Sequence, residues 1–403
     1  MRTPAGPSPR LQIRDARERA LVATADRVLA AGAALGRPFR RRRDSQPPQR
    51  ILLLRLERIG DLLMALPAIA DVRTLAPRAT IDLVVGSWNR DLAGAITAVT
   101  SVETMDAAWL ARDGGGAGIA TLLIAARRWR RQQYDLAINF EPDIRSNLLL
   151  AAAGAKSTAG YRSGGGGPLL DIPLEYDAGA HTADNARALV TAAFGRAPGQ
   201  TQVPALALPA SAHSAAATRL EGAPGPLVGV HVSGGRAIKQ WDPDRFADVA
   251  LRLIETAGAT IVLTGSPGDR TLVDRVTAAL PPGRVIDAAD LDLLSAAAVL
   301  QRLDLLVTGD TGPMHLAGAV GTAVVAVFGP SDPARYGPAG ASDRIVRVDL
   351  PCSPCNRIRR PPTRCTGHTP DCLALISADS VFNAAMAVLD ARRERLLSHS
   401  AAV

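Results

Sequence analysis

Residues 51–85 read ILLLRLERIGDLLMALPAIADVRTLAPRATIDLVV, and their pattern predicts how the rest of the chain is organised. An apolar run (51–56) ends in charged residues, a helix-length segment follows (62–75), and TIDLVV (80–85) is a second apolar run. Apolar strands that alternate with helices are typical of a parallel sheet covered on both faces. We therefore expect a strand–turn–helix–strand unit, with further strands at 135–140 and near 156–160 and helices at 121–133, 144–153 and 182–194.

The same pattern starts again after residue 226. We expect strands at 227–232 and 260–265 with a helix at 243–258 between them, and strands at 303–309 and 323–329 flanking a short helix at 313–320. The stretch before this restart is rich in Pro, Ala and Gly, which suits an interdomain connection. The sequence therefore predicts an α/β protein built from two doubly wound, Rossmann-like halves.

Five segments follow from this pattern. They are a basic N-terminal extension (1–49), an N-terminal domain (50–200), a linker (201–226), a C-terminal domain (227–385) that contains a cysteine-rich loop (351–373), and a C-terminal tail (386–403). A chain of 403 residues is long enough for two domains of ordinary size. Ligands of such sheets bind beyond the carboxyl ends of the strands, so the loops after residues 56, 232, 265, 308 and 328 are the places to seek chemistry.

The composition is that of a globular protein, with 47% hydrophobic and 21% charged residues. No run of about 18 uncharged apolar residues occurs, so we expect no membrane-spanning helix. Asp26 and Arg27 interrupt the Ala/Leu/Val-rich stretch near the N-terminus, which argues against a secretory signal. We therefore expect a cytoplasmic protein.

The net charge of +8 is confined to the N-terminal extension. Residues 1–50 hold twelve arginines and four acidic residues, whereas the remaining 353 residues hold 34 charges of each sign. An enzyme of nucleic acids would carry its positive charge on the folded body, so we expect no nucleic-acid partner. Two interpretations of the arginines at 37–43 remain: attraction to an anionic membrane surface, or a solvated tail.

The loop after the first expected strand carries Arg58, Gly60 and Asp61. A carboxylate at the start of a helix can cap exposed N–H groups, and this role alone would explain Asp61. The alternative is a general base that takes a proton from an attacking hydroxyl. Arg58 and Gly60 are candidates for contacts with the acceptor of such a reaction.

The loop after the first strand of the second half is Ser233-Gly234-Gly235, followed by Lys239. Small residues after a strand let the backbone approach a phosphate closely. Lys239 is one of two lysines beside 44 arginines, which suggests a need for a compact ammonium group, although a solvated lysine fits as well.

A third segment runs through Asp310, Thr311, Gly312 and His315 between a strand and a short helix. Free N–H groups at a helix start attract phosphate, and Asp310 could accept hydrogen bonds from sugar hydroxyls. Alternatively, Thr311 is only an N-cap. His231, at the end of a strand, is a weaker candidate than His315.

Four cysteines, Cys352, Cys355, Cys365 and Cys372, fall within 21 residues. Such a group could hold a structural zinc ion, but the second pair lacks the usual spacing. Free thiols are the alternative.

RIGD (58–61), SGGRAIKQW (233–241) and GDTGPMHLAGAVGTAVVAVFGPSDP (309–333) together resemble glycosyltransferase family 9, the lipopolysaccharide heptosyltransferases and their relatives. The resemblance covers roughly residues 50–385. It implies a GT-B architecture, in which two Rossmann-like domains face an interdomain cleft, the first handling the acceptor and the second an ADP-sugar donor. It also implies inverting transfer that needs no metal or other cofactor, onto a lipid-linked acceptor at the inner face of the cytoplasmic membrane.

The resemblance assigns roles residue by residue. Asp61 matches the family's catalytic carboxylate, Lys239 matches the residue that neutralises the donor diphosphate, and Asp310, Thr311, Gly312 and His315 match the donor-binding turn. We therefore expect transfer of heptose from ADP-heptose to a lipopolysaccharide-core or related lipid-linked glycan. The alternatives are another nucleotide sugar, a non-catalytic nucleotide-sugar-binding protein, or a dinucleotide-binding oxidoreductase, which the missing G-x-G-x-x-G motif disfavours.

Overall fold

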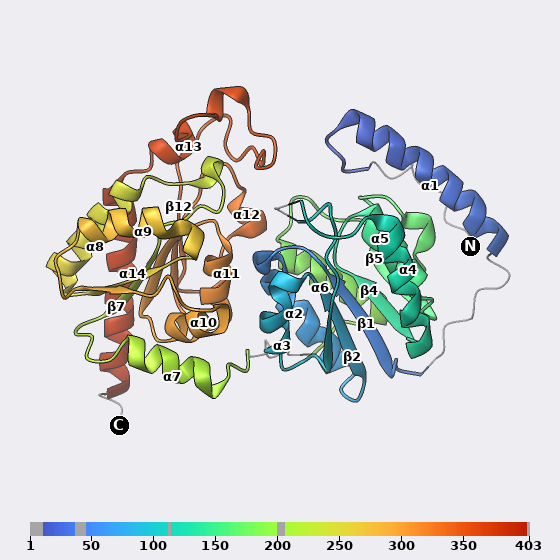
Figure 1. Ribbon diagram of the computed structural model, residues 1–403, viewed down its shortest axis with the longest axis horizontal. Helices are drawn as coiled ribbons and strands as arrows, with labels where there is room; N and C mark the ends of the chain where they lie inside the picture. The colour runs from blue at the N-terminus through green and yellow to red at the C-terminus, as the bar shows by residue number, and fades with distance from the viewer. Residues whose placement is uncertain (1–10, 37–45, 112–113, 200–205, 401–403) are drawn as a thin grey trace. The chain divides into compact units, whose positions relative to one another are not determined.

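The chain forms two compact units, which divide between residues 204 and 205. The computed structural model describes residues 11–36, 46–111, 114–199 and 206–400. Each unit contains one six-stranded sheet in which all neighbouring strands are parallel, with helices packed on it (Figure 1). The two units are described separately below.

The first sheet has the strand order β3-β2-β1-β4-β5-β6. The central strand β1 pairs with β2 from Arg50↔Thr80 to Arg55↔Val85 and with β4 on its other side. The order reverses between β1 and β4, so the loops after these two strands open a crevice at the carboxyl edge. The strands are β1 (Arg50–Arg55), β2 (Thr80–Val85), β3 (Ser101–Thr104), β4 (Leu136–Asn139), β5 (Ser157–Tyr161) and β6 (Ile172–Leu174).

Helices α2 and α6 contact each other, as do α4 and α5, so the first sheet carries two helical layers. Leu52, Leu54 and Leu56 share one buried cluster with side chains of α4 and α5. The helix expected at 121–133 changes to 3₁₀ geometry at Arg127, where Trp129 is buried and donates from Nε1 to Glu103 Oε2 (3.0 Å). The helices are α1 (Ala16–Gly36), α2 (Ile59–Leu75), α3 (Arg90–Gly94), α4 (Ile119–Ala126), α5 (Ile144–Ala152) and α6 (Thr182–Phe194), with 3₁₀ turns η2 (Ser87–Asn89), η3 (Arg127–Gln132) and η4 (Gly167–Leu169).

The second sheet has the strand order β12-β11-β10-β7-β8-β9. When its strands are counted from β7 and the sheet is read from the β9 edge, this order is the same as that of the first sheet. Its reversal lies between β7 and β10, whose following loops carry the second and third segments singled out in the sequence. The strands are β7 (Leu227–His231), β8 (Thr260–Thr264), β9 (Val285–Asp287), β10 (Leu305–Gly309), β11 (Val324–Val327) and β12 (Arg344–Val346).

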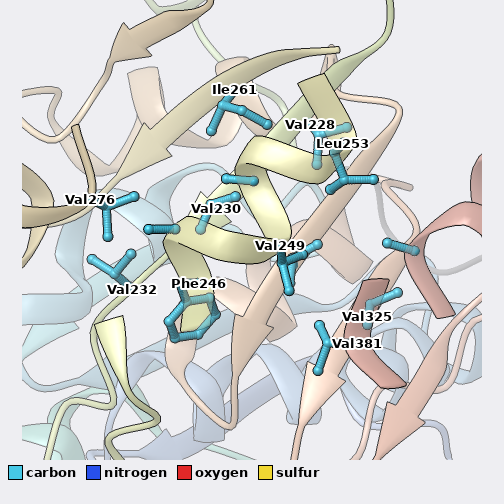
Figure 2. Packing of buried hydrophobic residues seen from close by; sticks show 14 of the residues in the cluster. Val228, Val230, Val232, Phe246, Val249, Leu253, Ile261, Val276, Val325 and Val381 are labelled. Atoms are coloured by element: carbon cyan, nitrogen blue, oxygen red, sulfur yellow. The ribbon is translucent and has the colours of Figure 1, made fainter. Parts of the chain in front are cut away.

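Alternate strand residues build the core of the second unit. Val228, Val230 and Val232 point to the face on which α8 packs with Phe246 and Val249 (Figure 2). The helices are α7 (Ala210–Arg219), α8 (Pro243–Ala257), α9 (Arg270–Ala278), α10 (Leu293–Gln301), α11 (Gly312–Ala319), α12 (Pro333–Tyr336), α13 (Asp371–Ala374) and α14 (Ala378–Ser400), with 3₁₀ turns η5 (Ala237–Lys239), η6 (Pro267–Asp269) and η7 (Thr363–Cys365).

Two expected boundaries need correction. The linker expected at 201–226 contains helix α7, which packs on α10 and buries Ala212 and Ala216. The tail expected from residue 386 continues α14, which contacts α8 and buries Val388 and Leu389. Both segments bury small or apolar side chains against the second unit, so they belong to its fold.

The N-terminal extension contains α1, which contacts η4 of the first unit. The arginines at 37 and 40–43, on which the membrane interpretation depends, lie outside the described residues. None of the helices in the described ranges combines the length and hydropathy that a bilayer crossing requires.

Candidate functional site

Asp61 lies in the first turn of α2, where its carboxylate is held from two sides. Oδ2 accepts a hydrogen bond from the backbone N–H of Arg58 (3.1 Å), which closes a capping box at the helix start. Oδ1 lies 3.6 Å from Nη2 of Arg55, a buried side chain at the end of β1. The side chain of Asp61 remains 29% exposed. Asp61 therefore caps the helix and still presents its carboxylate to solvent at the carboxyl edge of the sheet.

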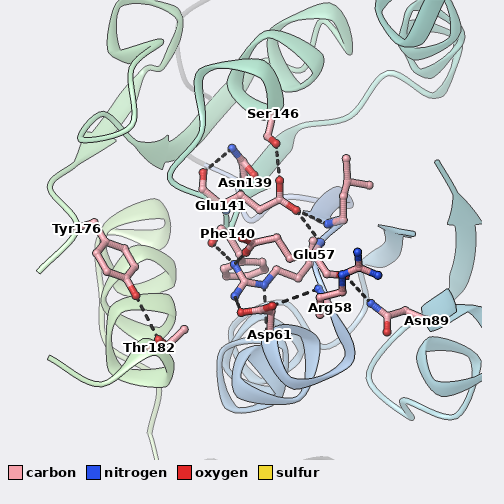
Figure 3. A network of polar contacts seen from close by, with 12 residues as sticks. Glu57, Arg58, Asp61, Asn89, Asn139, Phe140, Glu141, Ser146, Tyr176 and Thr182 are labelled. Carbon is pink, nitrogen blue, oxygen red and sulfur yellow. Dashed lines mark hydrogen bonds and ion pairs between the residues drawn. The ribbon is translucent and has the colours of Figure 1, made fainter. Parts of the chain in front are cut away.

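Arg55 contacts Asp61 and two other residues that Figure 3 labels, Glu57 and Phe140. Its guanidinium donates to the backbone oxygens of Asp61 (3.1 Å) and Phe140 (2.5 Å) and pairs with Glu57 Oε2 (3.0 Å). Burial lowers the pKa of Arg55, but the carboxylates of Glu57, Asp61 and Glu141 more than offset burial, and the net pKa is raised. A fixed positive charge thus lies behind Asp61.

Glu141, just after β4, is 2% exposed and ties the two central loops together. Its Oε1 accepts the backbone N–H groups of Leu56 and Glu57, and its Oε2 accepts the hydroxyl of Ser146. Burial raises the pKa of Glu141, against the opposing effects of Ser146 and Arg55. The buried carboxylate therefore fixes the backbone that leads from β1 to Asp61.

Arg58 extends away from the helix that it caps. Its guanidinium stacks on the ring of Trp88 (4.8 Å to the ring centroid) and donates to the backbone oxygen of Leu110. Arg145 stacks in the same way on Trp109 (4.8 Å). Two arginines thus lie on tryptophan rings: Arg58, three residues before Asp61, and Arg145, which follows β4. Planar guanidinium groups held in this way suit carboxylate or phosphate groups of a ligand.

In the second unit, Lys239 and Asp310 form an ion pair. Lys239, at the end of η5, donates from Nζ to Asp310 Oδ2 (3.0 Å) and to the backbone oxygen of Asp310. These contacts bring the loop after β7 to the turn after β10. The structure therefore joins two residues that the sequence placed 71 positions apart.

The glycines of the same loop are needed for close backbone packing. A Cβ on Gly234 would lie 2.6 Å from Gln240 N and from the carbonyl of Lys239, and Gly235 has a φ of 65°. The N–H of Gly234 donates to Gln240 Oε1 (2.7 Å) and that of Gly235 to Ser233 Oγ (3.2 Å). The Ser233–Gly235 turn is therefore a shaped loop, not a solvated linker.

Thr311 occupies the N-cap position of α11, but its hydroxyl does not cap the helix. Oγ1 lies 3.3 Å from Thr308 Oγ1 and 3.5 Å from the oxygen of Gly309. The first-turn N–H groups, including that of Gly312, thus receive no bond from the N-cap side chain within the described residues. Those N–H groups and the helix dipole favour an anion at this end. His315 lies half-buried in the first turn and a half of the same helix.

His231 is a buried neutral residue. Its Nδ1 lies 3.1 Å from Thr264 Oγ1, and burial lowers the pKa of His231 to about 4. Nearby, Ser233 donates to Asp269, whose pKa is lowered by this bond and by Ser266 despite partial burial. A histidine that is neutral at physiological pH supplies no positive charge to an anion, so His231 is not a candidate for that role.

None of the four cysteines, all of which lie in the described residues, forms a disulfide. Burial, with smaller contributions from Cys355, Cys365 and Cys352, raises the pKa of Cys372 to about 11. Across the described ranges, no group of three or more His, Cys, Asp or Glu side chains is arranged to hold a metal ion.

A cavity of about 1520 Å³ lies at the opposite, amino edge of the first sheet, near the starts of β1, β4 and β5. Its arginines satisfy backbone oxygens at helix ends: Arg130 donates to Ala152, Arg196 to Leu75 and Arg50 to Gln132. These three arginines therefore cap carbonyl groups at helix ends, and this structural role explains their presence in the cavity wall. This cavity is therefore separate from the residues around Asp61.

The sequence analysis singled out Asp61, Lys239 and Asp310 as candidates and missed Arg55 and Glu141, which the structure ties to Asp61 and to the backbone of Leu56 and Glu57. Both missed residues are charged and lie at the carboxyl ends of central apolar strands. A charge that interrupts or directly follows a buried strand is the signal that could have identified them, because burial of such a group requires a partner.

Comparisons with known proteins identify the family and the fold. A family model described as Glycosyltransferase family 9 (heptosyltransferase) matches residues 123–363. The lipopolysaccharide heptosyltransferase 1 of Pseudomonas aeruginosa is 25% identical over 337 residues, which cover 76% of this chain and 86% of that protein. The lipopolysaccharide core heptosyltransferase OpsX of Haemophilus influenzae is 23% identical over 312 residues, covering 75% and 86%.

Solved structures show the same fold. The ADP-heptose lipopolysaccharide heptosyltransferase II of Escherichia coli has a TM-score of 0.69 at 22% identity, over 85% of this chain and 99% of that chain. A family 9 glycosyl transferase of Veillonella parvula has a TM-score of 0.72 at 24% identity, over 85% and 97%. The predicted GT-B class with two Rossmann-like domains is confirmed.

Proposed function

This chain belongs to glycosyltransferase family 9, and we propose that it transfers heptose from ADP-heptose to a lipopolysaccharide-core or related lipid-linked glycan. The family makes the chain a glycosyltransferase. The names of its relatives, which act in lipopolysaccharide heptosyl transfer, support the choice of sugar and acceptor.

Asp61 is the general base of the proposed reaction. Its carboxylate takes the proton from an acceptor hydroxyl while the oxygen forms a bond to the anomeric carbon of the donor. The bond from that carbon to the diphosphate breaks on the opposite face, and ADP leaves with the bonding electrons, so the configuration inverts. The exposed carboxylate of Asp61, held by the Arg58 N–H and backed by Arg55, is the observation that carries this assignment.

The second unit holds the donor in this proposal. Negative charge grows on the leaving diphosphate, and Lys239 together with the first-turn N–H groups of α11 stabilises it in place of a divalent ion. Lys239 then exchanges part of its interaction with Asp310 for the diphosphate. Asp310 is left with acceptor capacity for sugar hydroxyls, and Ser233–Gly235 shape the loop against the phosphates.

In this proposal, residues of the first unit bind the acceptor. Arg58 and Arg145, which lie on Trp88 and Trp109, suit the anionic groups of a lipid-linked core glycan. Such an acceptor resides in a membrane, so the protein works at the inner face of the cytoplasmic membrane as a peripheral protein.

Calorimetric titration with ADP, UDP, GDP and NAD tests the donor assignment. We expect selective binding of ADP, which a Lys239→Ala substitution weakens. Preferential binding of UDP or GDP would contradict the assignment of ADP-heptose as the donor but not the family. Tight binding of NAD would contradict a nucleotide-sugar donor site altogether.

A further inference from the structure

The loop after β5 is the most glycine-rich segment of the first unit. Gly164 to Gly167 are consecutive, and Gly165 and Gly166 have φ values of 93° and 78°. A Cβ on Gly164 would lie 1.8 Å from the backbone oxygen of Pro142, so the loop rests against the segment after β4. It therefore lies at the same carboxyl edge of the sheet as the segment that holds Glu141.

A carboxylate from outside the sheet occupies this loop. Asp26 of α1 accepts a hydrogen bond from the N–H of Gly166 at Oδ1 (2.6 Å). Burial raises the pKa of Asp26, and this N–H only partly opposes the effect. The described residues give Asp26 no ion-pair partner. A half-buried carboxylate without a counter-charge is costly in a structural contact, but it is what a glycine-rich anion site would bind.

A second carboxylate of α1 faces the neighbouring loop. Glu18 lies close enough to Arg145 to raise the pKa of that arginine, after the larger effects of burial and of Asp143. Glu18 and Asp26 are eight residues apart, about two helical turns, so they lie on similar sides of α1. The helix therefore presents two negative charges to the loops after β4 and β5.

Apolar and polar contacts besides that of Asp26 also hold α1 in place. A Cβ on Gly165 would lie 2.3 Å from Cγ1 of Val22, so Val22 packs against the loop. Gln12 donates from its backbone N to the oxygen of Ser163 (2.8 Å) and from Nε2 to the oxygen of Tyr176 (2.6 Å). Two of its larger apolar side chains, Leu21 and Val28, are 72% and 69% exposed. In Figure 1, α1 lies at the top of the first unit, where it contacts η4. Among these contacts, the bond from the Gly166 N–H to Asp26 is the one that another anion could replace, because Gln12 donates to backbone oxygens and Val22 packs on Gly165.

We propose that the 163–167 loop is a binding subsite for phosphate or carboxylate groups of the acceptor, and that Asp26 of α1 fills it as an internal stand-in. The inference rests on the proposed function for the identity of the acceptor. Docking of α1 and binding of the acceptor's anionic group then exclude each other, so α1 sets the apparent affinity for the acceptor.

Hydrogen exchange of the full chain tests the site without any transfer reaction. We expect 10 mM inorganic pyrophosphate to speed exchange of the amides of residues 16–36, while sodium chloride of equal ionic strength does not. The experiment is repeated on Lys239→Ala, in which the proposed donor site is weakened. Faster exchange of α1 in that variant cannot then be attributed to pyrophosphate bound at the donor site. Unchanged exchange of α1 with pyrophosphate and with heptose-deficient lipopolysaccharide would overturn the proposal.

Steady-state kinetics of the transfer reaction provide a second, independent test. With saturating ADP-heptose and heptose-deficient lipopolysaccharide, Asp26→Ala should lower the acceptor KM about fivefold and leave kcat within about twofold, as expected for loss of a competing charge-assisted bond. Thr24→Ala, an exposed position on the same helix, is the matched control and should change neither. An unchanged or higher KM for Asp26→Ala would mean that α1 only braces the fold. Absence of any product would contradict the proposed function. The hydrogen-exchange experiment would still show whether the 163–167 loop binds an anion in competition with α1.

Discussion

Arg55 at the end of β1 and Asp61 in the first turn of α2 are joined through both the backbone and the side chain. Arg55 Nε donates to the backbone oxygen of Asp61 (3.1 Å), and Nη2 lies 3.6 Å from Oδ1. The arginine is buried and cannot move away, so it fixes the position of the carboxylate at the edge of the sheet.

The buried network behind Asp61 should be energetically coupled. Arg55→Met leaves buried carboxylates without their counter-charge and should lower the free energy of unfolding by about 3–5 kcal/mol. Glu141→Gln should cost about 1–3 kcal/mol through the Leu56 and Glu57 N–H groups. The double variant should lose less than the sum of the two.

Chemical denaturation of a Trp241→Phe background measures this coupling, because the three remaining tryptophans all lie in the first unit. Additive losses in the double variant would show that Arg55 and Glu141 act independently, against the network described here.

Lys239 and Lys156 offer a matched pair, since they are the two lysines of the chain. Lys239→Ala should weaken ADP binding about 10- to 100-fold, because a hydrogen bond to a charged group contributes about 1.5–3 kcal/mol. Lys156 pairs with Asp135 (2.9 Å) at the amino edge of the first sheet, so Lys156→Ala should leave ADP binding unchanged. Equal effects of both substitutions would argue against a donor site at Lys239.

His231 predicts a pH dependence of stability. Its pKa of about 4 in the folded state lies below its ordinary value of 6.5, so the folded state disfavours the protonated form. The contribution to stability is therefore complete above pH 6.5 and is lost as the pH falls towards 4, by at most about 3 kcal/mol. Hydrogen exchange of the β7 and β8 amides at several pH values measures this loss. His231→Asn should flatten the dependence, and an identical slope in both proteins would exclude His231 as its source.

The four cysteines should differ in reactivity. Cys372 is buried with a pKa of about 11 and should be alkylated by iodoacetamide at pH 8 at least about tenfold more slowly than the exposed Cys352. Denaturation should abolish the difference. Joint protection of all four thiols with one zinc ion per chain in metal analysis would instead establish the structural zinc site.

Local patterns predicted the buried elements well and the exposed ones poorly. The strand expected at 51–56 is observed as Arg50–Arg55, because burial on both faces demands an unbroken apolar run. The edge strands β6, β9 and β12 have three residues each and give no such signal. Helix α7 is mostly Ala and Ser, a composition that also fits a linker.

The candidate residues were predicted one by one, whereas their partners were not. Asp61 and Lys239 stand in motifs, but the bond from the Leu56 N–H to Glu141 depends on which strands are neighbours in the sheet. Strand order is a property of the whole fold, and the pairing of Glu141 with Leu56 spans 85 residues. Asp26 was used only to argue against a signal sequence, because nothing local links it to Gly166.

The most direct test of the proposed function is a transfer assay with ADP-heptose and heptose-deficient lipopolysaccharide, read by mass spectrometry of the product, for the native chain and Asp61→Asn. The native chain should add one heptose, and Asp61→Asn should do so at least about 100-fold more slowly with unchanged ADP affinity, because its amide cannot accept the proton. Equal rates for the two proteins would contradict Asp61 as the base, and transfer only from another nucleotide sugar would contradict the heptose assignment.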